Sequence, residues 1–410
     1  MVFLIINPNF QYRLEYFGSL LRNKKTGQVY KLGKINTLVL LIYQVSRYQD
    51  IIQSGYKSFS KDFGISCTQF NEAVEDLVSQ GIIVPTNNRP ISLLEDVPKI
   101  KKHFEENSPK KKNIIKPFWS HLQPFTRCNQ KCIHCYCKGG TKADPFLLSI
   151  EQWKCIIERL GGYGIFDIYI TGGENLMFPQ FFELASIILS KNLGFGLSTN
   201  ASIITSTVVS KLRELNIKKI QVSLDGTTSK TYEFIRGASL GSFNRSVLKG
   251  IRKLTEIAEV VINTVVNKLN FPELKDIITI GQSFGVKKFK FFPQKNCGRS
   301  KGYSDIILSD REIIDVLIPE CERLAKQYST KIETIGSGNC GSGISGFAIE
   351  QKGDIYPCIF GVSDKTQCMG NILSDSLDDV WFNSVKLDKF RKLDEGRLCH
   401  RCETPMSLFG

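Results

Sequence analysis

The segment RCNQKCIHCYCKGG, residues 127–140, holds four of the thirteen cysteines of a 410-residue chain. Three of these cysteines have the spacing C-x3-C-x2-C: Cys128, Cys132 and Cys135. The residues between them are polar and Gly139-Gly140 close the segment, so we expect a loop rather than a buried helix face. Thiolates are the usual ligands of iron–sulfur clusters, and three of them leave the fourth iron of a [4Fe–4S] cube open. Zinc is the alternative, with Cys137 or His134 as its fourth ligand.

Length and composition describe an ordinary globular protein. The chain is 42% hydrophobic and 23% charged, and 410 residues are enough for two or three domains. No apolar run approaches the ~20 residues that span a bilayer, and the start MVFLIINPNF lacks the basic segment and cleavage site of a signal peptide. We therefore expect a cytoplasmic protein with no membrane partner, in which the cysteines do not form a disulfide framework.

The net charge of +14 allows two interpretations. An acidic partner, such as nucleic acid or an acidic peptide, would suit it, and so would a lysine-rich solvated surface. The lysines are spread along the chain, which favours the solvated surface. The N-terminal segment is not unusually basic and shows no aromatic–basic interleaving, which argues against a nucleic-acid partner.

The sequence divides into four parts: residues 1–95, a linker at 96–116, then 117–305 and 306–410. In the first part, two strand-like segments flank the turn-like KKTG (24–27). Helical patterns follow at 34–48, 50–60 and 67–81, and then the strand-like IIV at 82–84. A hairpin with three helices predicts a winged-helix-like domain, whose edge strand is able to accept an added peptide strand.

The third part alternates strand and helix patterns. The expected strands are 118–123, 166–170, 194–199, 218–224, 260–266 and 287–292. Six such units predict an α/β fold with a parallel sheet, as a partial (β/α)6 TIM-like barrel. Functional residues of such folds lie at the carboxyl ends of the strands. The cysteine loop directly follows the first expected strand.

Residues suited to a polar ligand follow the next three strands in order: Thr171-Gly172-Gly173-Glu174, Ser198 and Asn200, Ser223 and Asp225, and later Arg236. With the loop, this pattern resembles the radical S-adenosylmethionine (radical SAM) superfamily over residues 117–300, with His134 at the aromatic position of its C-x3-C-x-(aromatic)-C motif. The resemblance implies that the three cysteines hold a [4Fe–4S] cluster. It also implies that S-adenosyl-L-methionine binds at these residues: His134, Gly172, Gly173, Glu174, Ser198, Asn200, Ser223, Asp225 and Arg236.

The last part adds a second group of cysteines. Cys340 and Cys358 fit C-x12-G-x4-C around Gly353, and Cys399 and Cys402 form C-x2-C. This pattern resembles the SPASM extension, in the shortened one-cluster form called a twitch domain, because the further SPASM cysteines are not found after Cys402. It implies an auxiliary [4Fe–4S] cluster on these four cysteines, with Cys368 as a fifth or alternative ligand. Zinc is again the alternative.

The N-terminal pattern resembles the recognition element of ribosomal peptide (RiPP) maturases, which hold a leader peptide as an added strand. We therefore expect a radical SAM peptide-modifying oxidoreductase that forms a thioether in a ribosomal precursor peptide, with flavodoxin or ferredoxin as the reducing partner. A peptide epimerase, with Cys297 as hydrogen donor, or a carbon–carbon crosslinking enzyme is the alternative on the same fold. A nucleic-acid-modifying or nucleic-acid-binding iron–sulfur protein is the alternative of another class.

Overall fold

The structure, a computed structural model, describes residues 3–15, 18–45, 65–86, 116–141, 147–334 and 341–392. It divides into two compact units, Met1–Ile115 and Lys116–Gly410, which are described here one at a time. The helix expected at 50–60 and nearly all of the expected linker lie outside the described residues. So do three of the cysteines expected at the auxiliary cluster: Cys340, Cys399 and Cys402. The domain boundaries expected from the sequence stay a prediction.

The first unit combines small antiparallel sheets with helices. Its elements are β1 (Phe3–Ile6), β2 (Phe10–Glu15), β3 (Gly18–Asn23), β4 (Val29–Gly33), α1 (Lys34–Val45), α3 (Cys67–Ser79) and β5 (Ile83–Thr86). Strands β2, β3 and β4 form one sheet in that order, and β1 pairs with β5. The expected hairpin is β3–β4, whereas β1 and β2 were not expected.

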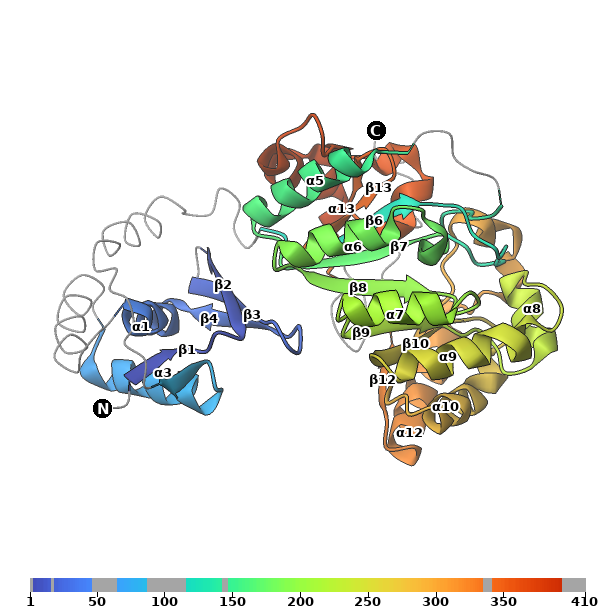
Figure 1. Ribbon diagram of the computed structural model, residues 1–410, viewed down its shortest axis with the longest axis horizontal. Helices are drawn as coiled ribbons and strands as arrows, with labels where there is room; N and C mark the ends of the chain where they lie inside the picture. Colours follow the sequence, from blue (N-terminus) through green and yellow to red (C-terminus); the bar gives the residue numbers. More distant parts are fainter. Residues whose placement is uncertain are drawn as a thin grey trace. The chain divides into compact units, whose positions relative to one another are not determined.

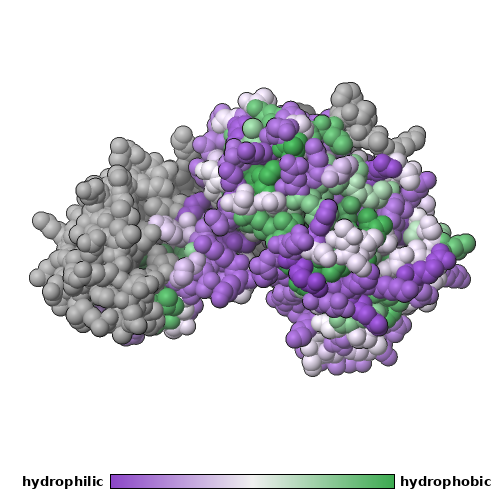
Figure 2. Space-filling model, in the orientation of Figure 1, coloured by the Kyte–Doolittle hydropathy of each residue, from purple (hydrophilic) through white to green (hydrophobic). Residues whose placement is uncertain are grey.

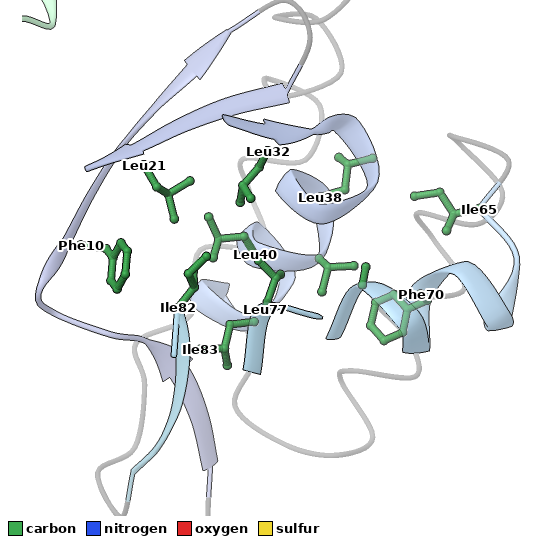
Figure 3. Packing of buried hydrophobic residues seen from close by; sticks show 12 residues of the cluster. Phe10, Leu21, Leu32, Leu38, Leu40, Ile65, Phe70, Leu77, Ile82 and Ile83 are labelled. Atoms are coloured by element: carbon green, nitrogen blue, oxygen red, sulfur yellow. The ribbon is translucent and has the colours of Figure 1, made fainter. Parts of the chain in front are cut away.

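The first unit has a hydrophobic core of its own (Figure 3). Helix α3 begins at a capping box, in which Ser66 and Gln69 satisfy each other's backbone N–H groups. Its residue Leu77 is fully buried, together with Leu21 of β3 and Leu40 of α1. Figure 3 shows these side chains pointing into one cluster between the strands and the helices. This packing holds the β2–β3–β4 sheet against the two helices.

The second unit is built on a ten-stranded sheet. Its strands are β6 (Trp119–Phe125), β7 (Asp167–Gly172), β8 (Gly194–Thr199), β9 (Lys219–Ser223), β10 (Glu259–Val266), β11 (Lys288–Pro293), β12 (Lys331–Thr334), β13 (Gly346–Glu350), β14 (Asp354–Tyr356) and β15 (Gly370–Asn371). Their order is β12-β11-β10-β9-β8-β7-β6-β13-β14-β15. Strands β6 to β11 are parallel, which confirms the expected α/β, partial TIM-like barrel.

Helices alternate with the parallel strands and cover one face of the sheet. They are α5 (Ile150–Tyr163), α6 (Phe181–Ser190), α7 (Ser206–Glu214), α8 (Ser229–Arg236), α9 (Leu248–Thr255), α10 (Leu274–Ser283) and α12 (Ile318–Gln327). Figure 1 shows α6, α7 and α9 in front of the strands. In β7, Ile168 and Ile170 are fully buried, while Tyr169 between them is 41% exposed. The sheet therefore has an apolar face under the helices and an open inner face.

The C-terminal hairpin β13–β14 continues the same sheet. Strand β13 pairs in parallel with β6, so that β6, which leads into the cysteine loop, has a partner on each side. Two separate helical segments follow in this part of the chain. A π-helical turn, Asp379–Asn383, ends at Ser384, whose hydroxyl accepts from the amide of Leu387 and starts a separate helix, α13 (Val385–Lys392).

No helix among the described residues is long and apolar enough to cross a membrane. The face of the second unit visible in Figure 2 is largely hydrophilic, with small separate hydrophobic patches.

Candidate active site

The cysteine loop, residues 127–140, begins at the carboxyl end of β6. The three cysteines of its C-x3-C-x2-C pattern are buried or half-buried: Cys128, Cys132 and Cys135. Two sulfurs already accept backbone hydrogen bonds, from Gln130 to Cys128 at 3.4 Å and from Gly139 to Cys135 at 3.2 Å. Such N–H···S bonds are typical of cluster-binding loops, where they tune the cluster. The donor set therefore fits an iron–sulfur cluster.

The thiols of the loop differ in acidity. Burial raises the pKa of Cys132 to about 12 and also raises the pKa of Cys128. A hydrogen bond from Cys137, at 3.7 Å between the sulfurs, lowers the pKa of Cys135 to about 5. Cysteine ligands bind metal as thiolates, so any of these thiols that is protonated releases its proton when a cluster binds. Among the described residues, no three His, Cys, Asp or Glu side chains are grouped closely enough to hold a single metal ion.

A buried ion network anchors the first half of the loop. The carboxylate of Asp225, at the end of β9, accepts from Arg236 at 2.8 Å and from His134 at 3.0 Å. Arg236 also donates to Gln130 at 2.9 Å. Burial opposes the charge of Asp225, but His134 and Arg236 hold the pKa of its carboxyl group below its ordinary value. The structure thus brings three expected site residues together, but as partners of one another.

Backbone hydrogen bonds join the same half of the loop to the end of α8. The amide of Lys131 donates to Arg236 at 3.0 Å and that of Ile133 to Ile235 at 2.9 Å. Gly237, with φ of 53°, makes this approach feasible, because a Cβ there would lie 2.6 Å from the Lys131 carbonyl oxygen. Helix α8 therefore ends against the loop.

The Gly172-Gly173 pair lies beside the chain that enters the loop. A Cβ at Gly172 would lie 2.4 Å from the Phe125 oxygen, and one at Gly173 would lie 2.1 Å from the Arg127 oxygen. The amide of Gly173 donates to Phe125 at 2.9 Å. Glycines in a ligand-binding turn let the backbone approach the ligand closely. The structure supplies a second reason, which is close approach to the protein's own backbone.

Glu174 joins the ends of β7 and β8. Its carboxylate accepts from the Thr199 hydroxyl and from the Asn200 amide, both at 2.7 Å, and the side chain is 1% exposed. Burial raises the pKa of this carboxyl group. The Asn200 side chain donates to Asn129 of the loop at 2.9 Å. The expected binding of S-adenosylmethionine by Glu174 stays a prediction, and in this structure its oxygens accept from protein donors.

Polar side chains line the inner face of the sheet near the loop. Ser198 and Gln221 are opposite each other on β8 and β9, 3.4 Å apart, and Ser223 is opposite Asn263 on β10. All are half-buried. This face offers hydrogen-bond partners to a polar ligand held beside the loop.

An apolar cluster joins the second half of the loop to the C-terminal hairpin. Tyr136, Cys137 and Cys368 pack against it, and its buried members are Ala348, Tyr356, Ile359 and Val362. The rings of Tyr136 and Phe360 meet edge to face at 5.5 Å. Cys358, next to Ile359, is buried, and the alternative ligand Cys368 is half-buried, so both expected auxiliary ligands that the structure describes lie near the apolar cluster that contacts the loop.

Sequence reasoning missed several residues that hold the loop, above all Gln130, Arg299 and Phe360. Their partners are distant in sequence, and no spacing rule connects them. Cys297, the candidate hydrogen donor, lies close to this region but is only 3% exposed.

Comparison with known proteins shows the family. The model of the radical SAM superfamily matches residues 122–279, and that of the SPASM iron–sulfur cluster-binding domain matches residues 340–403. Mycofactocin maturase MftC of Mycobacterium tuberculosis is 30% identical over 290 residues, which are 67% of this chain and 73% of the relative. The chain belongs to the radical SAM superfamily. As a radical SAM enzyme it uses S-adenosylmethionine with a [4Fe–4S] cluster, and its SPASM domain carries an auxiliary iron–sulfur cluster.

Two further proteins resemble this radical SAM chain, one in sequence and one in structure. Sporulation killing factor maturation protein SkfB of Bacillus subtilis is 26% identical over 272 residues, which are 64% of each chain. Among solved structures, Streptococcus suis SuiB bound to precursor peptide SuiA superposes with a TM-score of 0.72 and 20% identity. That match covers 95% of this chain and 90% of SuiB, and it shows that the two share a fold.

Proposed function

We propose that this radical SAM enzyme matures a ribosomally synthesised precursor peptide by forming a thioether. Cys128, Cys132 and Cys135 are the ligands of its radical cluster, and Cys340, Cys358, Cys399 and Cys402 those of its auxiliary cluster. The observation that carries the proposal is that one chain contains both the cysteine loop and a separate N-terminal unit. The maturase relatives MftC and SkfB and the fold shared with SuiB, whose structure contains a precursor peptide, support it.

The N-terminal unit is suited to hold a leader peptide. Strands β2 and β4 are the outer strands of its three-stranded sheet, and an outer strand offers unpaired N–H and C=O groups to an added strand. The net charge of +14 would attract an acidic leader. Flavodoxin or ferredoxin is the proposed reducing partner.

Within the barrel, the chain's own residues have three tasks. The three cysteines hold the cluster, and Asn129, Gln130 and His134 fix the loop through the end of β8, helix α8 and the end of β9, respectively. Polar groups of the inner face, including Ser198, Ser223 and the Asn200 side chain, orient the cofactor. S-adenosylmethionine and the reduced cluster would supply a 5′-deoxyadenosyl radical to take one hydrogen atom from a peptide carbon. A cysteine sulfur of the peptide would bond to that carbon with loss of its proton, and the auxiliary cluster would accept the one electron left over.

Two observations favour a thioether over the epimerase alternative. Oxidative bond formation releases an electron that the auxiliary cluster can take up, whereas epimerisation releases none. An epimerase also needs a thiol that reaches the peptide radical, and Cys297 is 3% exposed.

Mass spectrometry of the precursor peptide tests the proposal. After reaction with the enzyme, the peptide should be lighter by two hydrogens per link, and the linked cysteine should resist alkylation. Loss of two hydrogens with every cysteine still open to alkylation would indicate a carbon–carbon bond instead. An unchanged mass in normal water, with deuterium gained in heavy water, would indicate the epimerase. An enzyme without the first 115 residues should still cleave S-adenosylmethionine but should no longer process the full-length peptide.

A further inference from the structure

The segment that follows β11 lies directly against the second half of the cysteine loop. Gly298 has φ of 58°, and a Cβ there would lie 2.2 Å from the Tyr136 oxygen and 2.4 Å from the Cys135 oxygen. A side chain at this position would push the two segments apart. The glycine at this position therefore permits the direct contact between the two backbone segments.

Arg299, the next residue, makes three hydrogen bonds to the loop. Its guanidinium donates through Nη1 to the carbonyl of Cys132 and through Nη2 to that of Gly139, both at 2.6 Å. Its backbone amide donates to the carbonyl of Cys135 at 2.9 Å. The carbonyls that accept these bonds belong to Cys135 itself and to one residue on each side of it in the sequence. The bonds also fix Gly139, whose amide donates to the Cys135 sulfur.

Buried hydrogen bonds hold the residues next to Arg299 in place. Ser300 is fully buried and accepts from the Gln294 side chain at 2.7 Å. Gln294 in turn accepts from the Asn267 side chain at 3.0 Å, and its amide donates to Val266 at 2.8 Å. These hydrogen bonds fix the position of Arg299 relative to the carboxyl ends of β10 and β11. Arg299 in turn fixes the loop relative to these strands.

The charge of Arg299 is not cancelled locally. Both guanidinium contacts are neutral carbonyls, and no carboxylate pairs with Arg299 within the part of the chain that the structure describes. The reduction potential of an iron–sulfur cluster depends on nearby charge and on hydrogen bonds to its sulfurs. A fixed cation beside Cys135 favours the reduced cluster, which carries one more negative charge.

We propose that Arg299 is a positioning residue of the radical cluster, which fixes the loop around Cys135 and raises the reduction potential of the cluster. The inference rests on the proposed ligand role of Cys128, Cys132 and Cys135.

The test compares Arg299→Gln, Arg299→Lys and the matched control Lys301→Gln, which removes one charge from an exposed residue of the same segment. Each variant is purified anaerobically with both clusters, titrated for its midpoint potential by electron paramagnetic resonance, and followed by amide hydrogen exchange of residues 130–140. Arg299→Gln should lower the ratio of reduced to oxidised radical cluster at a fixed potential by roughly tenfold, equivalent to ~59 mV. It should also speed exchange in the loop.

Arg299→Lys should restore much of the potential but not the slow exchange, because an ammonium group cannot bridge two carbonyls as a guanidinium does. Lys301→Gln should match wild type in both measurements. Wild-type potential and exchange in Arg299→Gln would overturn the proposal. If Arg299→Gln does not retain the radical cluster, the proposal is tested on Arg299→Lys. Wild-type rates of amide exchange in the loop of Arg299→Lys would then overturn the proposal. Retention of the radical cluster after loss of the three cysteines would instead refute the ligand assignment.

Discussion

The two halves of the cysteine loop are held in different ways. The first half, Cys128–His134, is tied to β8, β9 and α8 by a buried network centred on the carboxylate of Asp225. The second half, Cys135–Gly140, is held by hydrogen bonds from Arg299 to the carbonyls of Cys135 and Gly139 and by apolar packing of Tyr136 on the C-terminal hairpin. The first half therefore depends on a buried ion network, and the second on hydrogen bonds from Arg299 to backbone carbonyls and on apolar packing.

This difference has an energetic consequence. Removing one partner of a buried ion network leaves an unpaired charge and is strongly destabilising. Removing one contact of a packed surface costs much less, because its neighbours remain. Changes in the first half should therefore disrupt the loop, and changes in the second half should tune it.

The largest effect should come from the thiols that both halves supply. Replacing Cys128, Cys132 and Cys135 together by Ala should remove about four irons, one [4Fe–4S] cluster, and abolish formation of 5′-deoxyadenosine. The exposed Cys155 of α5 gives a matched control, and Cys155→Ala should leave iron content and cofactor cleavage unchanged. Iron analysis and chromatography of the nucleoside products measure both. Continued cofactor cleavage by the triple variant would refute the radical site.

Asp225→Asn should be the most damaging single change in the network. It removes the charge that Arg236 and His134 share while both stay buried, and this should lower the free energy of unfolding by about 3–5 kcal/mol. Denaturant titration measures the loss. The surface pair of Arg311 and Asp315 offers a control, since Asp315→Asn should leave the unfolding curve in place. A stability loss in Asp225→Asn no greater than in this control would mean that the network does not hold the first half.

The pH dependence sharpens the same claim. The folded-state pKa of Asp225 lies below its unfolded value, so its stabilisation is present above the unfolded pKa of about 3.9 and is lost as the pH falls through the folded value. The stability gap between wild type and Asp225→Asn should therefore be constant from about pH 7 to pH 5 and should narrow below about pH 4. Unfolding curves at each pH measure this gap. A gap that closes already at neutral pH would assign the effect to another group.

The smallest effect should come from the second half. A double-mutant cycle with Tyr136→Leu and Phe360→Leu should give a coupling of about 0.5–1.5 kcal/mol, as expected for an edge-to-face aromatic pair. Each single variant should keep the radical cluster, which separates this half from the Asp225 network. The free energies of unfolding of the four proteins measure the coupling. Coupling as large as the loss in Asp225→Asn would remove the distinction between the halves.

The fold and the location of the site were predictable from the sequence because both depend on local patterns. Short apolar segments marked the strands from β6 to β11, and the loop cysteines follow the first of them. Tertiary partners were not predictable: Arg299 has no motif, and the role of Glu174 as a link between β7 and β8 depends on Thr199 and Asn200. The sequence predicted that Asp225 and Arg236 contact the cofactor. It did not predict that the two side chains are buried and pair with each other. The pairing of strand β13 with β6 was not predictable either, because no local pattern indicates it.

Transfer of deuterium from the peptide tests the central claim most directly, that this loop directs radical chemistry at a peptide carbon. A precursor peptide deuterated at the carbon that forms the link would be incubated with the reduced enzyme and S-adenosylmethionine, and the 5′-deoxyadenosine would be analysed by mass spectrometry. We expect deuterium to appear in the nucleoside in step with formation of the thioether. Unlabelled 5′-deoxyadenosine, formed while the peptide is modified at that carbon, would contradict the account.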